Sequence, residues 1–522
     1  MKFRTPVNIN KTKSQYLIVV IAALVFCLGL YLRLLFLQLP YWFDEANTIY
    51  YINQSFARMM EFIRHDFSPP LYHILLRGWV KAFGQSEEVS GWFSLILNIL
   101  TLPLIYFFGR KVANKQVGLF AAIIFWLSPL FIFQSTNTRM YSLETLLGVL
   151  SCLFLWQIFQ DGQWHNWLSY IIFTLLGLYT HTTFLFLVAA QFFTWIIFYY
   201  VLKCPHVLWK KWFLAQLVIL IGYLLWLPVF LRQLFQNQSP IYWTDFVAKK
   251  SFFSAGDILA NAVSSPDYSL VRMILSLAVI YLVYLSLRPK SSDYEVKVDR
   301  QSLFFLINLI VIPLMVVYFT DVLIDKFIIY IFPLFFLILA IGIYNLKFNF
   351  PMKFLLTSSF LILLSVSTLN SFEHFNDNSG QFLTPTAAKF LESNIDQSKS
   401  NIILAIGHVE KVLLDYYYQG TTEIIGAFPP SLIENNDQEV SAIIYNGRPV
   451  IDENNVNEVY DIVSEYDSVW LVSFPDQLIY DPLNLVEVNL SKNCRLAVRF
   501  SFPGHYTTLD KIEVFNFIDC LE

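Results

Sequence analysis

Residues 16–38 read YLIVVIAALVFCLGLYLRLLFLQ, a nearly unbroken apolar run of the length that crosses a membrane. A helix needs about 17 to 25 mostly apolar residues to span a hydrocarbon core roughly 30 Å thick. The run therefore predicts a first transmembrane helix with lipid as its solvent.

Similar apolar runs recur until about residue 370. The whole chain of 522 residues is 56% hydrophobic, 18% aromatic and only 14% charged, which no soluble domain of this length would match. We therefore expect a polytopic α-helical membrane protein with about eleven transmembrane helices. The further ten spans are expected near residues 92–108, 117–134, 141–159, 167–180, 184–202, 212–231, 269–287, 302–320, 327–345 and 352–370.

The distribution of lysine and arginine predicts the orientation, because cytoplasmic loops retain the positive charges. The N-terminus is then cytoplasmic, and an odd number of crossings puts everything after Asn370 outside. We expect a membrane domain at 1–370, an extracytoplasmic domain at 371–522 and no cleavable signal peptide. The basic residues of the cytoplasmic set are Lys2, Arg4, Lys11, Lys13, Arg110, Lys111, Lys115, Lys203, Lys210, Lys211, Arg288, Lys290, Lys297, Arg300, Lys347 and Lys353.

The first external loop, about 39–91, is too polar to cross the bilayer and too hydrophobic for a floppy linker. We expect amphipathic helices that lie on the membrane, the first over Glu45 to Arg64 and a second after Pro69 and Pro70. The apolar face of the first has residues at three- and four-residue spacings: Ile49, Ile52, Phe56, Met59, Met60 and Ile63.

The tail after Asn370 predicts a soluble α/β domain, because turn formers separate short β-branched runs. Cys494 and Cys520 lie in this external part, so they could form a lasting disulfide or remain two small unpaired side chains. Strands are expected at 401–406, 441–445, 468–473, 495–500 and 512–517, and helices near 385–394, 409–419 and 454–465.

Polar and ionisable residues gather at the outer ends of the predicted spans, where charge is costly unless it has a use. Charge counting puts all of them on the extracytoplasmic side, although they come from separate loops. They are Asp44, Glu45, His65, Asp66, Arg139, Tyr141, His181 and Lys326.

Several short motifs around these residues resemble the membrane glycosyltransferases of the protein mannosyltransferase and aminoarabinose transferase type, which have the GT-C fold. The resemblance covers residues 15–200 well and extends more loosely through 325–330 and Pro333. Its motifs are Asp44-Glu45, Asp66-Phe67-Ser68-Pro69-Pro70-Leu71-Tyr72, Phe83-Gly84, Gly109-Arg110 and Thr138-Arg139-Met140-Tyr141-Ser142-Leu143.

The resemblance implies a polyprenyl-phosphate donor that carries mannose or a related sugar, and it implies that Asp44 acts on the acceptor. A phosphate leaving group needs no proton, whereas an acceptor hydroxyl must lose one, so a single general base suffices for an inverting transfer. Glycoside hydrolysis, by contrast, needs paired carboxylates. Glu45 is expected to orient the loop or an arginine, or to be a solvated carboxylate.

Arg139, Lys326 and Tyr141 are candidates for binding the donor phosphate, whose charge grows as the bond breaks. Relatives often carry Arg-Tyr where Lys326-Phe327 stands here, and lysine offers a point charge instead of a bidentate fork. The alternative for each cation is anchoring to lipid phosphates at a helix end.

His65, Asp66 and His181 could hold a divalent metal, bind substrate or cap helices. Glu144, about one turn inside the fourth span, is expected to order Arg139 or a nearby tyrosine. We expect no nucleic-acid partner, since no basic patch is interleaved with aromatic residues.

Two rival functions are a polytopic transporter or lipid flippase, and a scaffold that displays its tail. A transporter should place its ionisable residues near the bilayer midplane, and a scaffold does not explain the motif cluster. A ligase or oligosaccharide transferase also fits the resemblance. The acceptor, whether protein, lipid or glycan, cannot be inferred from the sequence; the compact tail favours a bacterial inner membrane.

Overall fold

The structure is a computed structural model. It describes residues 9–66, 68–204, 208–235, 254–264, 270–288, 300–320, 324–378, 383–433, 437–444, 450–474, 480–502 and 512–520.

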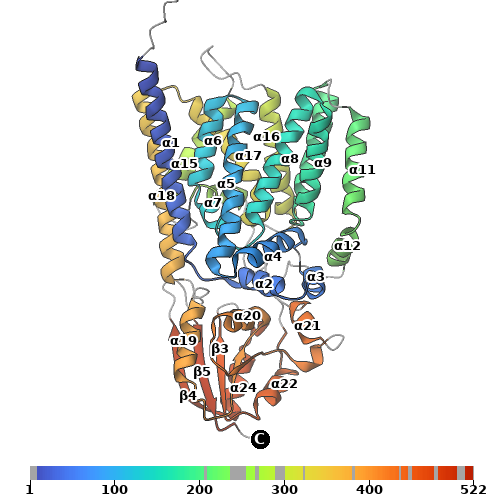
Figure 1. Ribbon diagram of the computed structural model, residues 1–522, viewed down its shortest axis with the longest axis vertical. Helices are drawn as coiled ribbons and strands as arrows, with labels where there is room; N and C mark the ends of the chain where they lie inside the picture. The colour runs from blue at the N-terminus through green and yellow to red at the C-terminus, as the bar shows by residue number, and fades with distance from the viewer. Residues whose placement is uncertain are drawn as a thin grey trace, which may run out of the picture.

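Each apolar run predicted to cross the membrane is mainly helical. The long helices run side by side along the long axis of the molecule, with α1 and α18 at one edge and α11 at the other (Figure 1). They are α1 (Ile9–Phe36), α5 (Glu87–Val112), α6 (Lys115–Leu127), α8 (Tyr141–Asp161), α9 (Trp164–Leu178), α10 (Phe184–Ile196), α11 (Trp209–Tyr223), α15 (Leu270–Leu287), α16 (Arg300–Phe319), α17 (Phe332–Tyr344) and α18 (Phe350–Asn378).

Within the described residues, 7 helices are long and apolar enough to cross a membrane, or 8 if α11 and α12 (Leu227–Phe235), bent by 79°, form one span. The segment Val20–Phe36 of α1 and helix α6 are apolar but shorter. The chain is therefore a multi-pass helical protein, and the number of eleven spans stays a prediction.

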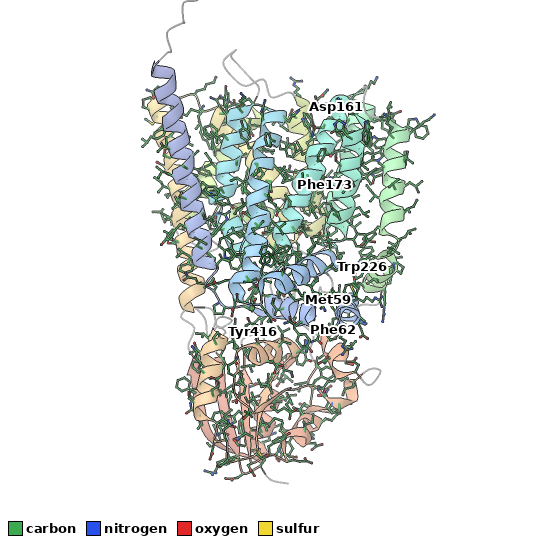
Figure 2. All side chains as sticks on the ribbon, viewed as in Figure 1. Met59, Phe62, Asp161, Phe173, Trp226 and Tyr416 are labelled. Carbon is green, nitrogen blue, oxygen red and sulfur yellow. A yellow bond between two sulfur atoms is a disulfide. The ribbon has the colours of Figure 1, made fainter. Side chains whose placement is uncertain are left out.

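Short helices cross the bundle at one end. They are α2 (Phe43–Asn53), α3 (Phe56–His65) and α4 (Leu71–Phe83), and they lie between the long helices and the C-terminal part (Figure 1). Figure 2 shows Met59 and Phe62 at this end and Asp161 at the opposite end.

The single helix expected over 45–64 is wrong, because the chain breaks between α2 and α3. The Ser55 side chain accepts a hydrogen bond from the backbone N–H of Arg58 and so caps a new helix. Arg77 of α4 donates to the carbonyls of Ile52 and Gln54, which the break leaves without helical partners. Helix α4 begins directly after Pro70, as the sequence predicts.

The C-terminal part contains a five-stranded sheet in the order β2-β1-β3-β5-β4. Strands β1, β2 and β3 are parallel, and β5 is antiparallel to both β3 and β4. The elements are α19 (Thr384–Asn394), β1 (Asn401–Ala405), α20 (His408–Tyr417), β2 (Glu423–Gly426), α21 (Gln438–Ile444), α22 (Val456–Val463), β3 (Ser468–Ser473), α24 (Leu485–Asn493), β4 (Arg495–Phe502) and β5 (Ile512–Ile518).

The strand expected at 441–445 is wrong, because residues up to Ile444 belong to helix α21; residue 445 lies outside the described residues. The Asp437 side chain accepts from the backbone N–H of Val440 at 3.1 Å, which favours a helix start here over a strand. Strand β2 was not predicted. Cys494 and Cys520 are joined by a disulfide beside the pair of strands β4 and β5.

The C-terminal part packs on the crossing helices through polar and aromatic contacts. Arg58 of α3 binds both carboxylate oxygens of Asp437, at 2.5 and 2.8 Å, and also Glu439 at 3.0 Å. The backbone N–H of Tyr41 donates to the Tyr417 hydroxyl at 2.7 Å. Helix α20 thereby lies against α2, directly beside the residues singled out in the sequence.

Candidate active site

Asp44 and Glu45 lie in the first turn of α2, which begins as soon as the chain leaves α1. The Glu45 carboxylate accepts from the backbone N–H of Trp42 at 3.1 Å, the reciprocal half of a capping box. Glu45 is thus turned back toward the protein, whereas 38% of the Asp44 side chain is exposed. Of the two carboxylates, Asp44 is the one that a solute can reach.

Lys326 forms an ion pair with Asp44, from a position 282 residues further along the chain. The Lys326 Nζ lies 3.1 Å from the Asp44 Oδ2 and 4.5 Å from the centre of the Trp42 ring. Lys326 belongs to the short 3-10 helix η2 (Asp325–Ile331), which packs closely on α8. A side chain at Gly148 of α8 would come within 2.5 Å of the Tyr330 side chain, so this glycine permits the close packing.

Arg139 approaches Asp44 from the loop before α8. Its Nη1 donates to the Asp44 backbone carbonyl at 3.2 Å and to the Thr48 hydroxyl at 2.9 Å. The Thr48 hydroxyl in turn donates to the Asp44 carbonyl at 2.9 Å. Arg139 therefore holds the backbone of α2, while its charge faces the same region as the Lys326 ammonium.

The charges around Asp44 favour its ionised form. Burial raises the pKa of Asp44, but the positive charges of Lys326 and Arg139 outweigh burial and lower the pKa below the ordinary value. Asp44 is therefore a carboxylate at neutral pH. A carboxylate can accept a proton, and it can do so more readily when a neighbouring cation moves away.

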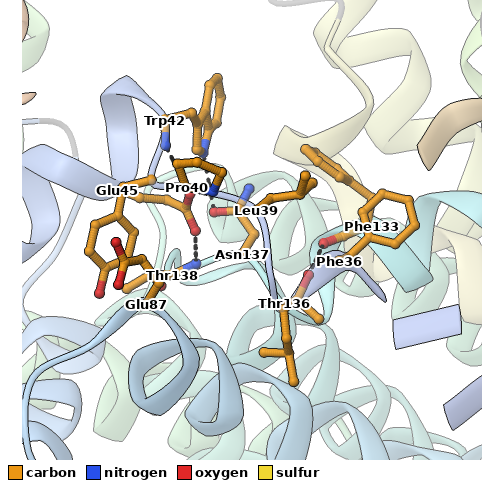
Figure 3. A pocket seen from close by; sticks show the side chains of 12 residues that line it. Phe36, Leu39, Pro40, Trp42, Glu45, Glu87, Phe133, Thr136, Asn137 and Thr138 are labelled. Carbon is orange, nitrogen blue, oxygen red and sulfur yellow. Dashed lines mark hydrogen bonds between the residues drawn. The ribbon is translucent and has the colours of Figure 1, made fainter. Parts of the chain in front are cut away.

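Glu45 connects two segments instead of facing an open site. It is 7% exposed, and its Oε1 accepts from the backbone N–H of Thr138, just before α8. Burial raises the pKa of Glu45 to about 7 despite these hydrogen bonds. Figure 3 shows Glu45 between Trp42 and Thr138 at the edge of a cavity.

That cavity lies between residues 36–42 and residues 133–138 (Figure 3). Its volume of about 20 Å³ holds a water molecule but no sugar. Asp44 and Lys326 do not line it. This cavity is therefore not the place where a sugar would meet Asp44.

His181 and Glu144 meet behind the ion pair. The His181 Nδ1 lies 2.6 Å from the Thr183 hydroxyl and 3.9 Å from the Glu144 Oε1. Thr183 also donates to the backbone carbonyl of Phe327, the residue next to Lys326. Burial lowers the pKa of His181 to about 3, so its imidazole is neutral. Glu144 therefore lies beside Thr183 and His181, and no contact joins it to Arg139 among the described hydrogen bonds.

Asp66 and His65 end helix α3 on the other side of Arg139. The Gln233 side chain donates to the backbone carbonyls of Arg64 and Asp66, which fixes this corner against α12. Burial lowers the pKa of Arg139, but nearby negative charge, mainly on Asp44 and also on Asp66, raises it overall. In the part of the chain that the structure describes, no group of three His, Cys, Asp or Glu residues could hold a metal ion.

The structure thus brings together Asp44, Arg139 and Lys326, with the Tyr141 ring centre 5.7 Å from the Lys326 Nζ, and sets His181 with Glu144 behind them. Sequence reasoning missed Trp42, Thr48 and Thr183. Trp42 stands two residues before Asp44, and its indole ring could have been singled out as a partner for a cation. The two threonines carry no sequence signal, because their contacts depend on how distant segments pack.

Residues 68–233 match a family described as dolichyl-phosphate-mannose-protein mannosyltransferase. No curated protein matches the chain. Among solved structures, ArnT of Cupriavidus metallidurans in its apo state is similar, with 10% identity and a TM-score of 0.55 over 97% of this chain and 98% of that one.

Two further structures contain lipid phosphates. ArnT of the same organism bound to undecaprenyl phosphate has 10% identity and a TM-score of 0.55, over 95% of this chain and 97% of that one. The archaeal oligosaccharyltransferase AglB of Archaeoglobus fulgidus, with an inhibitory peptide and a dolichol-phosphate, has 11% identity and a TM-score of 0.52 over 96% and 74%. By fold and by its family match, this chain resembles the GT-C glycosyltransferases of the protein mannosyltransferase and ArnT type, as its sequence predicts.

Proposed function

We propose that this protein is an inverting glycosyltransferase that moves a sugar, mannose or a related one, from a polyprenyl phosphate to an extracytoplasmic acceptor. The observation that carries the proposal is the ion pair between Asp44 and Lys326, at 3.1 Å, in a partly exposed position at one end of the bundle. It combines a group that accepts a proton with a cation that can bind a phosphate.

The reaction needs one proton acceptor and one site for negative charge. The acceptor hydroxyl attacks the anomeric carbon, its oxygen forms the new bond, and its proton passes to the Asp44 carboxylate. The bond from that carbon to the phosphate oxygen breaks, and the phosphate leaves with the electron pair. Lys326 and Arg139 stabilise the charge that grows on the leaving phosphate. A single displacement of this kind inverts the sugar configuration.

The same ion pair links donor binding to base activation. Lys326 lowers the basicity of Asp44 as long as it rests on the carboxylate. An incoming phosphate competes for the Lys326 ammonium and frees Asp44 to accept a proton. The base is then activated only when the donor is present, which protects the site from unproductive chemistry.

The membrane orientation belongs to the same proposal. The N-terminus is cytoplasmic, the C-terminal part lies outside, and the membrane is the bacterial inner membrane. The basic loops support the orientation, because Lys and Arg concentrate in alternate loops. The gathering of Asp44, Arg139 and Lys326 beside the C-terminal part supports an active site at the outer surface.

The rival function is a transporter or lipid flippase. Such a protein holds its substrate near the bilayer midplane, usually between broken helices. Asp44 and Arg139 instead lie at the end of the bundle, among the crossing helices and the loop before α8. This position favours transfer chemistry over transport.

Purified protein in liposomes tests the proposal, supplied with polyprenyl-phosphate sugars labelled in the sugar and with membrane extract of a deletion strain as the acceptor source. We expect the label to leave the lipid and to appear in the extract, with free polyprenyl phosphate as the second product. Label that stays on the lipid but changes leaflet would support the flippase instead. Glycan profiles of the deletion strain then identify the acceptor.

A further inference from the structure

A second cavity lies where the C-terminal part meets α2. Its volume is about 260 Å³, close to the lower end of the range for small-molecule sites, about 300 to 1,000 Å³. It opens at the carboxyl ends of the parallel strands β1 and β2, where α/β sheets usually bind ligands. Tyr50 of α2 closes it from the other side.

The local fold brings a histidine to this cavity. The chain turns sharply after β1 at Gly407, whose φ of 103° suits glycine, and α20 starts directly with His408. Strand β2 ends beside this turn, since the backbone N–H of Ala427 donates to the Ala405 carbonyl at 2.7 Å. The His408 side chain is only 6% exposed.

Two buried polar atoms at this cavity lack partners. Among the described residues, neither the His408 Nε2 nor the Tyr480 hydroxyl has a hydrogen-bond partner, although the two side chains are 6% and 4% exposed. An unmet buried polar group costs about 1 to 3 kcal/mol, so such groups in a native protein call for an explanation. A ligand that lies in the cavity and bonds both atoms supplies one.

The remaining polar groups define the chemistry of that ligand. Burial lowers the pKa of His408 to about 4, so its neutral ring offers one donor and one acceptor, and a tyrosine hydroxyl also offers both. The carboxylates of Glu439 and Glu423 and the ammonium of Lys411 line the cavity. Lys411 is paired with Asp415, and Glu439 with Arg58 and the Tyr50 hydroxyl. Because the lysine of the lining is already paired with a carboxylate, the cavity disfavours phosphates and carboxylates.

The geometry points to a saccharide-binding subsite in this cavity, built for a neutral or amino-bearing sugar unit and separate from the site at Asp44. Sugar hydroxyls both donate and accept, which matches His408 and Tyr480. Tyr50 lines the cavity with its ring held between Phe62, at 5.8 Å, and His408, at 5.7 Å, so it forms a rigid aromatic part of the wall.

Position connects this subsite to the proposed function. Asp44 and Tyr50 are six residues apart on the same helix, which is about 9 Å along its axis. A sugar chain whose distal unit sits at His408 therefore has its near end in the region of Asp44. The claim that the subsite holds the acceptor glycan rests on the proposed function. The claim that the cavity binds a saccharide does not depend on it.

Saturation-transfer NMR on the full chain in lipid nanodiscs, without sugar-based detergent, tests the subsite. The probes are methyl glucoside, glucosamine, glucuronic acid and maltose. We expect signals from methyl glucoside and glucosamine and weaker binding of glucuronic acid. Tighter binding of maltose than of methyl glucoside would identify the end of a longer glycan as the ligand; equal binding would identify a single sugar unit.

Variants assign the binding to the cavity. Tyr480→Phe removes only the hydroxyl, and His408→Phe replaces the imidazole by a larger ring without polar atoms; each should weaken binding about three- to tenfold, the effect of one lost hydrogen bond. Tyr466→Phe changes a tyrosine that does not line the cavity and should leave binding unchanged. Absence of saccharide binding, or equal binding by Tyr480→Phe and the unchanged protein, overturns the subsite and leaves the transferase proposal standing.

Discussion

Arg33 and Lys326 are both largely shielded from solvent, and they are held in opposite ways. Arg33 of α1 is fully buried and donates to the carbonyls of Gly29 and Trp126, at 3.0 and 2.7 Å, and to the Asn98 side chain at 3.0 Å. Every one of these acceptors is neutral. Lys326, by contrast, is 14% exposed and bonds the carboxylate of Asp44, which is itself partly exposed.

The difference separates a structural cation from a candidate functional one. Arg33 also stacks on the Trp126 ring at 3.8 Å, so it joins α1 to α6, and no substrate anion has access to it. Lys326 is bound to the carboxylate of Asp44, a partly exposed anion that another anion can replace. Charge alone therefore does not show whether a buried cation is functional. What separates the two is whether another anion can replace the group that the cation binds.

The largest effect should come from removing the base. Asp44→Asn keeps the shape of the side chain but cannot take up the acceptor proton, so transfer should fall about 10² to 10⁴-fold. The matched control is Asp161→Asn at the far end of the bundle. Full transfer by a folded Asp44→Asn protein would remove Asp44 from the mechanism. The measurement is initial transfer rate in liposomes.

Replacing each of the two cations by methionine tests whether Lys326 is functional and Arg33 structural. Lys326→Met should lower transfer about 10² to 10³-fold, the usual cost of losing a group that stabilises developing charge, with little change in melting temperature. Arg33→Met should do the reverse, because it leaves buried acceptors unmet at about 1 to 3 kcal/mol each. Transfer per folded Arg33→Met molecule should be unchanged.

Lys326→Arg tests whether the positive charge itself is needed. It keeps the charge and should restore part of the transfer lost in Lys326→Met. Equal losses of stability in Lys326→Met and Arg33→Met would show that both cations are structural. The two measurements are thermal unfolding in nanodiscs and transfer corrected for the folded fraction.

A smaller effect should follow from Thr48→Val, which removes the hydroxyl that bonds Arg139 and the Asp44 carbonyl. Loss of one hydrogen bond to a charged group should lower transfer about tenfold. Thr48→Ser keeps the hydroxyl and should stay close to the unchanged rate. Similar rates for Thr48→Val and Thr48→Ser would mean that this bond does not position Arg139.

The smallest effect concerns Glu45 and pH. Burial raises its pKa from the ordinary 4.5 to about 7, so the folded protein binds this proton more tightly than the unfolded chain. Stability from this group is therefore highest below pH 4.5, falls as pH rises to about 7, and is constant above. Glu45→Gln should flatten the melting temperature over this range, whereas the exposed-site control Glu61→Gln should not. If the pH dependence of the melting temperature is the same in Glu45→Gln as in the unchanged protein, the raised pKa of Glu45 is contradicted.

Much of the fold could be predicted because its signals are local. Apolar runs of membrane length indicated the helices, and a short β-branched run between turn formers indicated the strand at Ser468–Ser473 with its observed bounds. Local signals failed where a short polar side chain caps a helix and so determines where the helix begins. Ser55 splits the loop helix, and Asp437 starts a helix where β-branched residues predicted a strand.

The candidate site could be predicted as a set of residues but not as a geometry. Charge counting put Asp44 and Lys326 on one side, yet nothing in the sequence reports that two groups 282 residues apart form an ion pair. The same limit hid Thr48 and Thr183, whose roles arise from packing alone. Predicted strand ends also did not reveal the cavity at His408, since β2 is only four residues long.

The most direct test of the central claim is a structure of the protein with polyprenyl phosphate, determined by electron cryomicroscopy in nanodiscs. We expect the lipid phosphate to lie between Lys326 and Arg139, with the Lys326 Nζ moved from its 3.1 Å contact with Asp44 to a phosphate oxygen and the Asp44 carboxylate released from this ion pair. A phosphate bound elsewhere, with the ion pair intact, would contradict it.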